Sequence, residues 1–546
     1  MRLLIFHGYL LHGTGSNVYN ANLAAALVRL GHEVHLCCQD RAPQELPFVD
    51  ALGDWDGGAL AVRTLREPVR CTVYRPALAG LLPVYVADRY AGVEARPFPD
   101  CTEAEVEAYV AANVRAVREL AARVSPDLAL ANHLVMGPLI LARALASGAA
   151  DGHAAGEGGP PGEIPYAVKV HGSAMEYVVA PHPERFLPAA REGLARARSV
   201  LVGSAHIADR LVETMGDPAL RARIRLGPPG VDVARFAPRA PAEARAGLDA
   251  LAGRLARAAA AGVAAGEDGS AFARDAGEAA GALADVAAGT DDRLVAFVGK
   301  LIVSKGIDLL LAAWPLVLAR EPRARLVVVG FGAYRAACER LVAALADGDE
   351  AALDALVAAG RAEEGGAAAP LRHLGAFLAS LAGEERARYR AAAAGLRERV
   401  VLTGRLDHDE LPDLLAACEA LVVPSTFPEA FGMVAAEGAA CGALPVCAAH
   451  SGLVEVADAL ARELPEPVRP WLAFPIEDDE AGAGGNPVFA IAERLLAWLA
   501  APQELRAATR QALVGTVQER WSWEGVARGV LAAAQAGADA PAGGER

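Results

Sequence analysis

Lysine is almost absent from this chain of 546 residues. Its 52 basic residues include only three lysines, Lys169, Lys300 and Lys305. The eight cysteines show no C-x-x-C spacing, which argues against a zinc knuckle or a disulfide framework and predicts reduced, mostly buried thiols. The chain also lacks a run of about 20 apolar residues free of charge and proline, so we expect no membrane-spanning helix.

Targeting signals and clustered positive charge are lacking as well. The apolar run at residues 3–6 is too short for a secretory signal, which predicts a cytoplasmic protein. Residues 1–240 carry 24 basic and 25 acidic side chains, whereas residues 241–546 carry 28 and 42. This balance argues against a nucleic-acid partner, which needs a clustered basic face. Any membrane contact is expected to be peripheral, at the inner face, through the N-terminal domain.

The order of apolar and glycine-bearing segments predicts a parallel α/β fold. Residues 3–6 are typical of a buried strand, residues 7–16 of a loop, and residues 18–30 of a helix that ends at Gly31. The next strand is expected at residues 33–37. Strand, loop, helix and strand make a βαβ unit, which is the building block of a doubly wound parallel sheet.

The same pattern recurs along the chain, which is long enough for two domains. Further strands are expected at residues 128–131, 166–170, 200–202, 294–298, 326–329, 400–403 and 420–423. Residues 240–290 and 333–398 are dominated by Ala, Gly, Arg and Glu, and we interpret them as helical or partly disordered insertions. The chain is therefore predicted to hold two α/β domains in tandem.

Two of the three lysines lie close together after a predicted strand. Lys300 and Lys305 are five residues apart, just beyond the strand expected at residues 294–298. Lysine alone is a weak signal for phosphate, and chance placement is the alternative. In a chain that builds nearly all its cations from arginine, the pair nevertheless favours a clamp for a negatively charged group.

The segment 428–438 combines a loop, a predicted helix and two glutamates. The helix is expected at residues 433–440, which puts Glu429 just before its N terminus and Glu437 within its first two turns. The free amides at the start of a helix favour an anion or a sugar oxygen. Ionised carboxylates accept hydrogen bonds from sugar hydroxyls, so the two glutamates suit a sugar ligand. A helix-capping acid and a surface acid are the alternative interpretation.

Further motifs join these two signals in one order along the chain. They are Gly13-Thr14-Gly15-Ser16, His171-Gly172, Gly203-Ser204, Pro229-Gly230-Val231-Asp232, Phe297-Val298-Gly299-Lys300-Leu301, Lys305-Gly306, Val401-Leu402-Thr403-Gly404, and Glu429 with Glu437. Together they resemble the retaining glycosyltransferases of the GT-B fold, family 4 (glycosyl transferases group 1). The resemblance covers nearly the whole chain except the two insertions, and the motifs are specific jointly rather than singly.

The resemblance implies two Rossmann-like, doubly wound parallel-sheet domains that face each other across a cleft. An acceptor-side domain is expected at residues 1–235 and a nucleotide-sugar-binding domain at residues 236–515. Residues 516–546 are expected to form a helix that crosses back to the N-terminal domain, followed by a tail. The implied activity is hexosyl transfer from a UDP-, GDP- or ADP-sugar to a glycan, a lipid or a small molecule.

The resemblance also implies roles for individual residues. The expected catalytic residues are His171, Lys300, Lys305 and Glu429, and the expected donor-binding residues are Gly15, Ser16, Lys300, Lys305, Phe431, Gly432, Met433 and Glu437. The two lysines would neutralise the donor diphosphate, which gains charge as it leaves. Glu437 would accept from the ribose hydroxyls, and Glu429 would hold the transferred sugar. The family usually has arginine at position 300, and lysine keeps the charge without the planar fork.

His171 is expected at the carboxyl end of its strand, where open α/β sheets bind ligands, and would bond the donor sugar. A purely structural histidine is the alternative. The resemblance implies no metal and no other cofactor. It also implies a same-face attack in which the leaving phosphate takes the proton of the acceptor.

Two other classes of function remain open. One is a GT-B protein that binds a nucleotide sugar without turnover, although intact Lys305, Glu429 and Glu437 argue against it. The other is an enzyme like the glycan phosphorylases, which use pyridoxal phosphate on the same architecture. That cofactor needs a Schiff-base lysine, and the second domain offers only Lys300 and Lys305.

Overall fold

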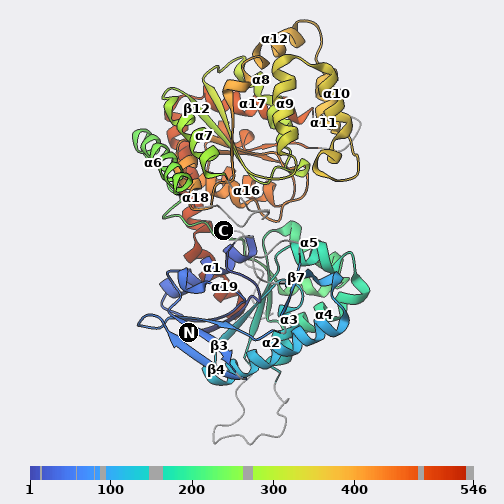
Figure 1. Ribbon diagram of the computed structural model, residues 1–546, viewed down its shortest axis with the longest axis vertical. Helices are drawn as coiled ribbons and strands as arrows, with labels where there is room; N and C mark the ends of the chain where they lie inside the picture. The colour runs from blue at the N-terminus through green and yellow to red at the C-terminus, as the bar shows by residue number, and fades with distance from the viewer. Residues whose placement is uncertain are drawn as a thin grey trace, which may run out of the picture. The chain divides into compact units, whose positions relative to one another are not determined.

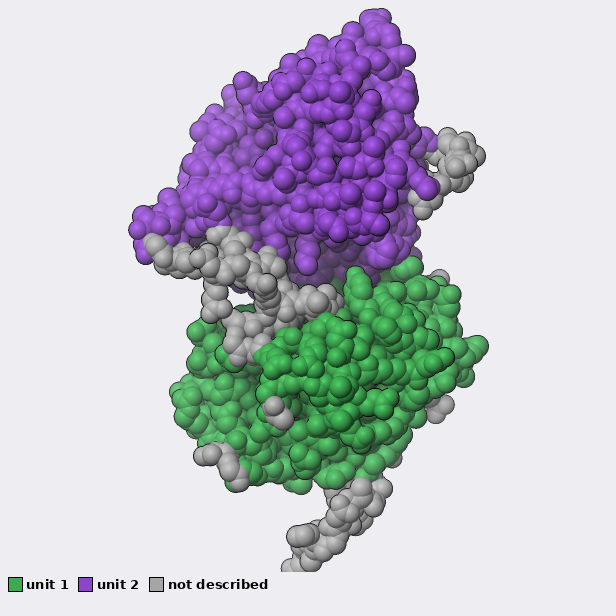
Figure 2. All heavy atoms as spheres, turned by 45° about the vertical axis from the view of Figure 1, so that its right-hand side comes forward, with its two compact units in different colours: residues 1–230, 521–546 green, residues 231–520 purple. Residues whose placement is uncertain are grey.

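The structure is a computed structural model. It describes residues 1–12, 15–56, 58–78, 80–85, 94–146, 164–261, 275–476 and 485–535. Residues 1–230 and 521–546 form one compact unit, unit 1, and residues 231–520 form a second, unit 2. Figure 2 colours the two units green and purple, and Figure 1 labels their elements. In the described part of the chain, no helix is long and apolar enough to cross a membrane.

Unit 1 is built around a nine-stranded sheet. Its strands are β1 (Arg2–Phe6), β2 (Glu33–Cys37), β3 (Ala51–Asp56), β4 (Ala59–Thr64), β5 (Cys71–Arg75), β8 (Leu128–Asn132), β9 (Tyr166–Lys169), β10 (Ser199–Val202) and β11 (Ile224–Leu226), with a separate pair β6 (Leu81–Val84) and β7 (Glu94–Pro97). Its helices are α1 (Gly15–Arg29), α2 (Glu103–Val124), α3 (Gly137–Ala144), α4 (Pro183–Ala195), α5 (Ala205–Met215) and α19 (Trp523–Gln535). All neighbours in the sheet are parallel except β3 and β4.

Alternate residues of the central strand β1 point to opposite faces of this sheet, as the pleat requires. Leu4 and Phe6 belong to the apolar core formed with α2, α3 and α4. Leu3 and Ile5 belong to the core on the other face, with α1 and α19. Figure 1 shows these helices on both sides of the sheet. A sheet covered on both faces explains why its strands are continuous apolar runs.

Unit 2 has a six-stranded parallel sheet in the order β14-β13-β12-β15-β16-β17. The strands are β12 (Arg293–Val298), β13 (Ala324–Val329), β14 (Val400–Gly404), β15 (Cys418–Val423), β16 (Leu444–Ala448) and β17 (Ala473–Phe474). The helices are α6 (Pro241–Ala260), α7 (Ala276–Ala288), α8 (Ile307–Leu318), α9 (Arg335–Asp347), α10 (Glu350–Ala359), α11 (Arg372–Ser380), α12 (Gly383–Ala393), α13 (Leu396–Arg399), α14 (Leu411–Leu415), α15 (Met433–Ala440), α16 (Ser451–Ala461), α17 (Pro487–Ala500) and α18 (Gln503–Trp521). The predicted α/β class and its two doubly wound parallel sheets are confirmed.

The start of the first helix differs from the prediction. Residues 15 and 16 were expected in a loop, but Gly15 and Ser16 form the first turn of α1. A β-carbon on Gly15 would meet no described atom within 4 Å, so packing within the protein does not require glycine there. Gly13 and Thr14, the other half of the motif, lie outside the described residues.

The segment after the second predicted strand contains more regular structure than expected. No strand was predicted between residues 37 and 128, yet β3, β4, β5, β6 and β7 lie there. Strand β4 is exposed along most of its length because it is the edge of the sheet. The segments interpreted as insertions hold helices α6 and α7, and α9 to α13.

Helix α19, at the far end of the chain, belongs to unit 1. Trp523 is buried in the same apolar core as α1, and its indole lies edge-on to the Tyr19 ring with centroids 5.4 Å apart. A β-carbon on Gly230 would lie 2.5 Å from Trp523 Cδ2, so only glycine lets the indole approach this closely.

We predict that Trp523→Ala lowers the free energy of unfolding of unit 1 by about 3–5 kcal/mol, because it leaves a large cavity between α1 and α19. Urea unfolding followed by circular dichroism measures the change. Arg528→Ala, at an exposed position of the same helix, is the control and should leave the midpoint nearly unchanged. Equal effects of the two substitutions would contradict the packing described here.

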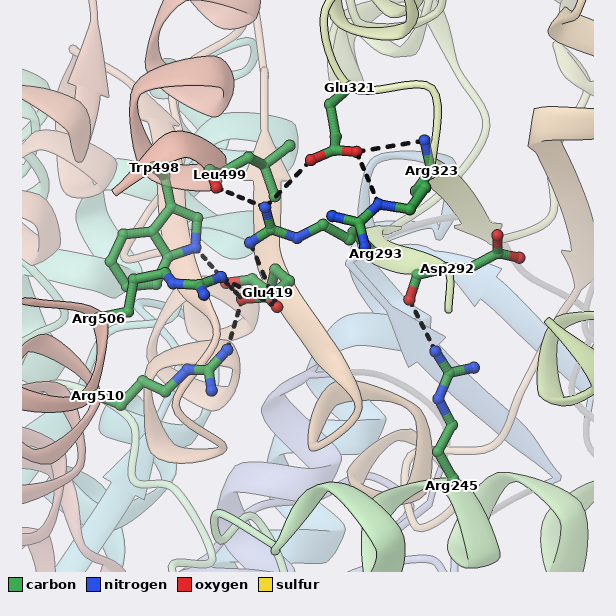
Figure 3. Close-up of polar contacts among 10 residues, drawn as sticks. All are labelled: Arg245, Asp292, Arg293, Glu321, Arg323, Glu419, Trp498, Leu499, Arg506 and Arg510. Atoms are coloured by element: carbon green, nitrogen blue, oxygen red, sulfur yellow. Dashed lines mark hydrogen bonds and ion pairs between the residues drawn. The ribbon is translucent and has the colours of Figure 1, made fainter. Parts of the chain in front are cut away.

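A cluster of arginines surrounds one glutamate in unit 2 (Figure 3). The Glu419 carboxylate accepts from Arg510 Nη2 at 2.5 Å and lies 3.5 Å from Arg506 Nη1 and from Arg293 Nη2. Burial, together with the charges of Arg293 and Arg510, lowers the pKa of Arg506 despite the attraction of Glu419. The negative charge of Glu419 therefore offsets the positive charges of three guanidinium groups, which would otherwise repel one another.

We predict that Glu419→Gln destabilises unit 2 by about 2 kcal/mol, a value reduced from that of a fully buried pair because these side chains are partly exposed. Added salt should shrink the difference from the wild type, since it screens the repulsion between the arginines. Thermal unfolding at low and high salt measures both effects. Glu463→Gln, at an exposed position of the same unit, is the control.

Candidate active site

The loops that follow the strands of unit 2 meet at one edge of its sheet. The chain starts at the central strand β12, continues outward through β13 and β14, and then returns to β15 on the other side of β12. In open α/β sheets, ligands bind at the carboxyl ends of the strands where the order reverses in this way. Lys300 and Lys305 follow β12, and Glu429 follows β15. All three residues therefore lie after the two strands between which the strand order reverses.

An ion pair joins two of the predicted residues at this point. Lys305 Nζ donates to Glu429 Oε1, and Ser425 Oγ donates to the same oxygen at 2.6 Å. The Lys305 and Glu429 side chains are partly buried. Lys300 is exposed, and among the described residues its side chain makes no hydrogen bond or ion pair. The structure therefore joins Lys305 to Glu429 directly and leaves Lys300 at the surface.

The backbone around Glu429 is fixed by the first residues of helix α16. The amide of Glu429 donates to Ser451 Oγ at 2.8 Å, and its carbonyl accepts from the amide of Gly452 at 2.9 Å. Helix α15 then begins after Gly432, which has a φ of 106°. A β-carbon on Gly432 would lie 2.6 Å from Leu453 Cδ2, so this position requires glycine for both reasons.

Helix α15 spans the predicted residues, and its first amides have no acceptor within the helix. Phe431 is buried and Met433 partly buried beside them. Glu437, on the second turn, is buried, and its Oε1 lies 2.7 Å from His408 Nε2. Although burial lowers the pKa of His408, the hydrogen bond to Glu437 and its charge outweigh that effect and raise it above the usual value.

Sequence reasoning missed His408 and the two aspartates beside it. All three follow β14, and their position after a predicted strand was the available signal. Asp407 Oδ1 lies 2.9 Å from Arg405 Nη2, and Asp409 Oδ2 lies 3.6 Å from Arg235 Nη2. Among the residues that the structure describes, no three His, Cys, Asp or Glu side chains gather as metal ligands do.

In unit 1, polar side chains also gather at the carboxyl edge of the sheet. His7 follows β1, Asn132 ends β8, and His171 follows β9. His171 Nε2 lies 2.8 Å from Asn132 Oδ1. Burial, with smaller effects from the nearby His133 and Lys169, holds the pKa of His171 well below its usual value. His171 is therefore a neutral imidazole near pH 7.

Lys169 lies beneath this group of residues. Its ammonium donates to the carbonyl of Gly227 and lies 5.2 Å from the centre of the Tyr19 ring. Burial lowers the pKa of Lys169 to about 7. The Tyr19 ring in turn lies edge-on to His171, with centroids 5.0 Å apart. The sequence-based prediction left Lys169 and Asn132 out of the site. The signal available for Asn132 was its position at the carboxyl end of a predicted strand, which is also where His171 lies.

Both units thus carry their functional candidates on the carboxyl edge of a doubly wound sheet, which is the arrangement of the GT-B class. Two family models match the chain: "Glycosyltransferase Family 4" at residues 13–235 and "Glycosyl transferases group 1" at residues 367–463. The chain belongs to the GT-B glycosyltransferases of group 1 and family 4.

Two curated bacterial proteins are similar over part of the chain. A D-inositol 3-phosphate glycosyltransferase of Segniliparus rotundus is 29% identical over 263 residues, which is 48% of this chain and 43% of that protein. A GDP-mannose-dependent monoacylated alpha-(1-6)-phosphatidylinositol monomannoside mannosyltransferase of Corynebacterium glutamicum is 25% identical over 237 residues, or 42% and 44%. Each match spans less than half of the relative's length.

Two solved structures share the fold over nearly the whole chain. Sucrose-phosphate synthase from Thermosynechococcus elongatus is 19% identical, with 97% of this chain and 96% of that chain covered and a TM-score of 0.50. The catalytic domain of starch synthase IV from Arabidopsis thaliana is 12% identical, with 99% of each chain covered and a TM-score of 0.52. At these identities the likeness supports the fold alone.

We predict that the contribution of His408 to stability depends on pH. Because pairing with Glu437 raises the pKa of His408 in the folded state, its stabilising effect is complete below about pH 6.5 and is lost as pH rises through the folded-state pKa. The difference in unfolding free energy between the wild type and His408→Gln should therefore be larger at about pH 5.5 than at about pH 8.5. The exposed His182→Gln is the control, and a difference that does not vary with pH would contradict the prediction.

Proposed function

We propose that the protein is a retaining, metal-independent glycosyltransferase that moves a hexose from a nucleoside diphosphate sugar to a hydroxyl-bearing acceptor. The observation that carries the proposal is the Lys305–Glu429 ion pair beside the start of α15, at the reversal point of the unit 2 sheet. An ammonium and free helix amides at one place make an anion site. The neighbouring carboxylates supply acceptors for hydroxyl groups.

In this proposal, unit 2 binds the donor. Lys305 and the free amides at Gly432 and Met433 contact the diphosphate, and the exposed Lys300 adds a second ammonium from the loop after β12. Glu437 offers Oε2 to a ribose hydroxyl, since His408 already occupies its Oε1. His408 thereby holds the carboxylate in place for the ribose.

The chemical step breaks the bond between the anomeric carbon and the phosphate oxygen, and forms a bond from the acceptor oxygen to the same carbon. Both electrons of the broken bond leave with the diphosphate, so its negative charge grows in the transition state. Lys305 and the helix N terminus stabilise that charge more than they stabilise the ground state, which accelerates the step. The proton of the acceptor moves to the leaving phosphate oxygen.

Retention follows from a same-face attack rather than from a carboxylate nucleophile. Glu429 Oε1 receives hydrogen bonds from both Lys305 and Ser425, which lowers its nucleophilicity and suits it to holding the sugar. The positive charges that a divalent metal would supply come instead from the two lysines and the helix terminus. Excess chelator is therefore expected to leave the rate unchanged.

Unit 1 has polar groups of its own that suit a sugar or a phosphate. His171 accepts a hydrogen bond from a sugar hydroxyl, and the start of α1 at Gly15 and Ser16, which is the positive end of the helix dipole, suits a phosphate oxygen. The names of the two bacterial relatives point to inositol-containing acceptors. An inositol phosphate is therefore the first acceptor to test.

We predict that one nucleoside diphosphate, and its sugar, raises the melting temperature of the protein by several degrees, whereas the matching nucleoside raises it far less. A ligand at about 100 times its Kd adds about 2.7 kcal/mol to the stability of the folded state. A thermal-shift panel of UDP, GDP, ADP, their sugars and the free nucleosides identifies the donor.

With that donor and an acceptor, the transferred sugar should keep its anomeric configuration, which proton NMR of the product reads directly. Failure of every nucleotide sugar to stabilise the protein would contradict donor binding. Stabilisation without release of nucleoside diphosphate, across the tested acceptors and water, would instead favour a binding protein without turnover. An inverted product would contradict the same-face mechanism.

A further inference from the structure

A chain of buried side chains connects three elements of unit 1. The two hydrogens of Asn20 Nδ2, on α1, are shared among three acceptors: His7 Nδ1 at 3.0 Å, Ser16 O at 2.9 Å and Asn132 Oδ1 at 3.1 Å. Asn132 ends β8 and joins this group to His171, which follows β9. Asn20 and Asn132 are both buried, so their hydrogen bonds are made within the protein rather than to bulk water.

The amide of Asn132 has only one orientation that satisfies these contacts. Its Nδ2 donates to the carbonyl of Phe6 at 3.3 Å, and its Oδ1 accepts from Asn20 Nδ2. If the amide were flipped, its oxygen would face the Phe6 carbonyl and its nitrogen would face the donor of Asn20. Asn132 Oδ1 is thus an acceptor on both sides, and His171 Nε2, 2.8 Å away, must carry the hydrogen.

The surroundings of His171 disfavour a second proton on its ring. Its neighbours are the His133 ring, with centroids 4.9 Å apart, the edge of the Tyr19 ring, and the ammonium of Lys169 behind that ring. Among the described residues, no carboxylate hydrogen-bonds to His171, and no partner lies against its Nδ1. The burial that holds the pKa of His171 low leaves Nδ1 unprotonated, with a lone pair that can accept a hydrogen bond.

We propose that Asn132 is a positioning residue that holds His171 as the neutral Nε2–H tautomer, so that Nδ1 accepts a hydrogen bond from a hydroxyl group of the transferred sugar. The identity of the ligand rests on the proposed function, whereas the tautomer of His171 rests on the hydrogen bonds of Asn132 alone. A ring nitrogen that can only accept selects a hydroxyl donor and repels phosphate oxygens. The network therefore suits this place to a hydroxyl group rather than to a phosphate oxygen.

The tautomer can be measured without any substrate. In the full chain labelled with ¹⁵N-histidine, NMR should show His171 with a hydrogen on Nε2 and none on Nδ1 at neutral pH, and no titration near pH 6.5, where exposed histidines titrate. His171→Gln assigns the resonances. A hydrogen on Nδ1, or an imidazolium at neutral pH, would overturn the inference even if glycosyl transfer were established.

Asn132→Asp tests the consequence for the reaction. A carboxylate beside Nε2–H favours the imidazolium, which turns Nδ1 from an acceptor into a donor at low pH. We expect kcat/KM of Asn132→Asp to fall about tenfold for each pH unit below the raised pKa of His171 and to recover at high pH, while the wild type changes little over the same range. The pKa of His171 measured by NMR in the variant should match the pKa read from the pH dependence of its kcat/KM.

Asn113→Asp is the matched control, because Asn113 is an equally buried asparagine of unit 1 on α2. Among the described residues, its Nδ2 donates only to the carbonyl of Tyr109. Its pH profile should keep the wild-type shape. Parallel profiles for Asn132→Asp and the wild type would overturn the positioning role. If Asn132→Asp does not fold, Asn20→Ala serves instead. This variant removes the donor that orients Asn132, and NMR should then detect both tautomers of His171, whereas a single Nε2–H tautomer would contradict the network.

Discussion

The ion pair between Lys305 and Glu429 is the contact on which the account of unit 2 depends. The two residues are 124 positions apart, but they follow β12 and β15, which pair in the sheet. Gly306, with a φ of 65°, lets the turn after Lys305 lie against the Pro424 carbonyl, where a β-carbon would come within 2.0 Å. The pair therefore holds an ammonium beside the start of α15 before any ligand arrives. Such preorganisation is what makes electrostatic stabilisation of a leaving group effective.

The two units place different chemistry at the same edge of the same kind of sheet. Unit 2 combines an ammonium, carboxylates and a helix N terminus, which suits a diphosphate and the hydroxyls around it. Unit 1 combines asparagines with histidines that burial keeps neutral. The pKa of His7 is lowered to about 4, and that of His171 also lies well below its usual range. A neutral acceptor suits a sugar hydroxyl and an ammonium suits a phosphate, so we assign the sugar and the leaving group to different side chains.

Much of this arrangement could be predicted from the sequence, because buried parallel strands are apolar runs and helix starts carry glycine or proline. The strands around His171, Lys300 and Glu429 and the bounds of α15 were found in this way. The partners that fix those residues were not predicted. His408 contacts Glu437, and Asn132 contacts His171, only because the fold brings distant segments together. The edge strand β4 was missed, and the first turn of α1 was assigned to the preceding loop because glycine is also typical of loops. Many of the arginines, of which those around Glu419 are an example, form ion pairs.

Calorimetric titration with a nucleoside diphosphate and with its parent nucleoside tests the central claim most directly. The account predicts that the wild type binds the diphosphate at least about 100-fold more tightly than the nucleoside, which corresponds to about 2.7 kcal/mol. Lys305→Met should remove most of that ratio and leave nucleoside binding unchanged, whereas Arg320→Met, at an exposed position of the same unit, should preserve it. An unchanged ratio in Lys305→Met would contradict the claim that this ammonium holds the leaving group.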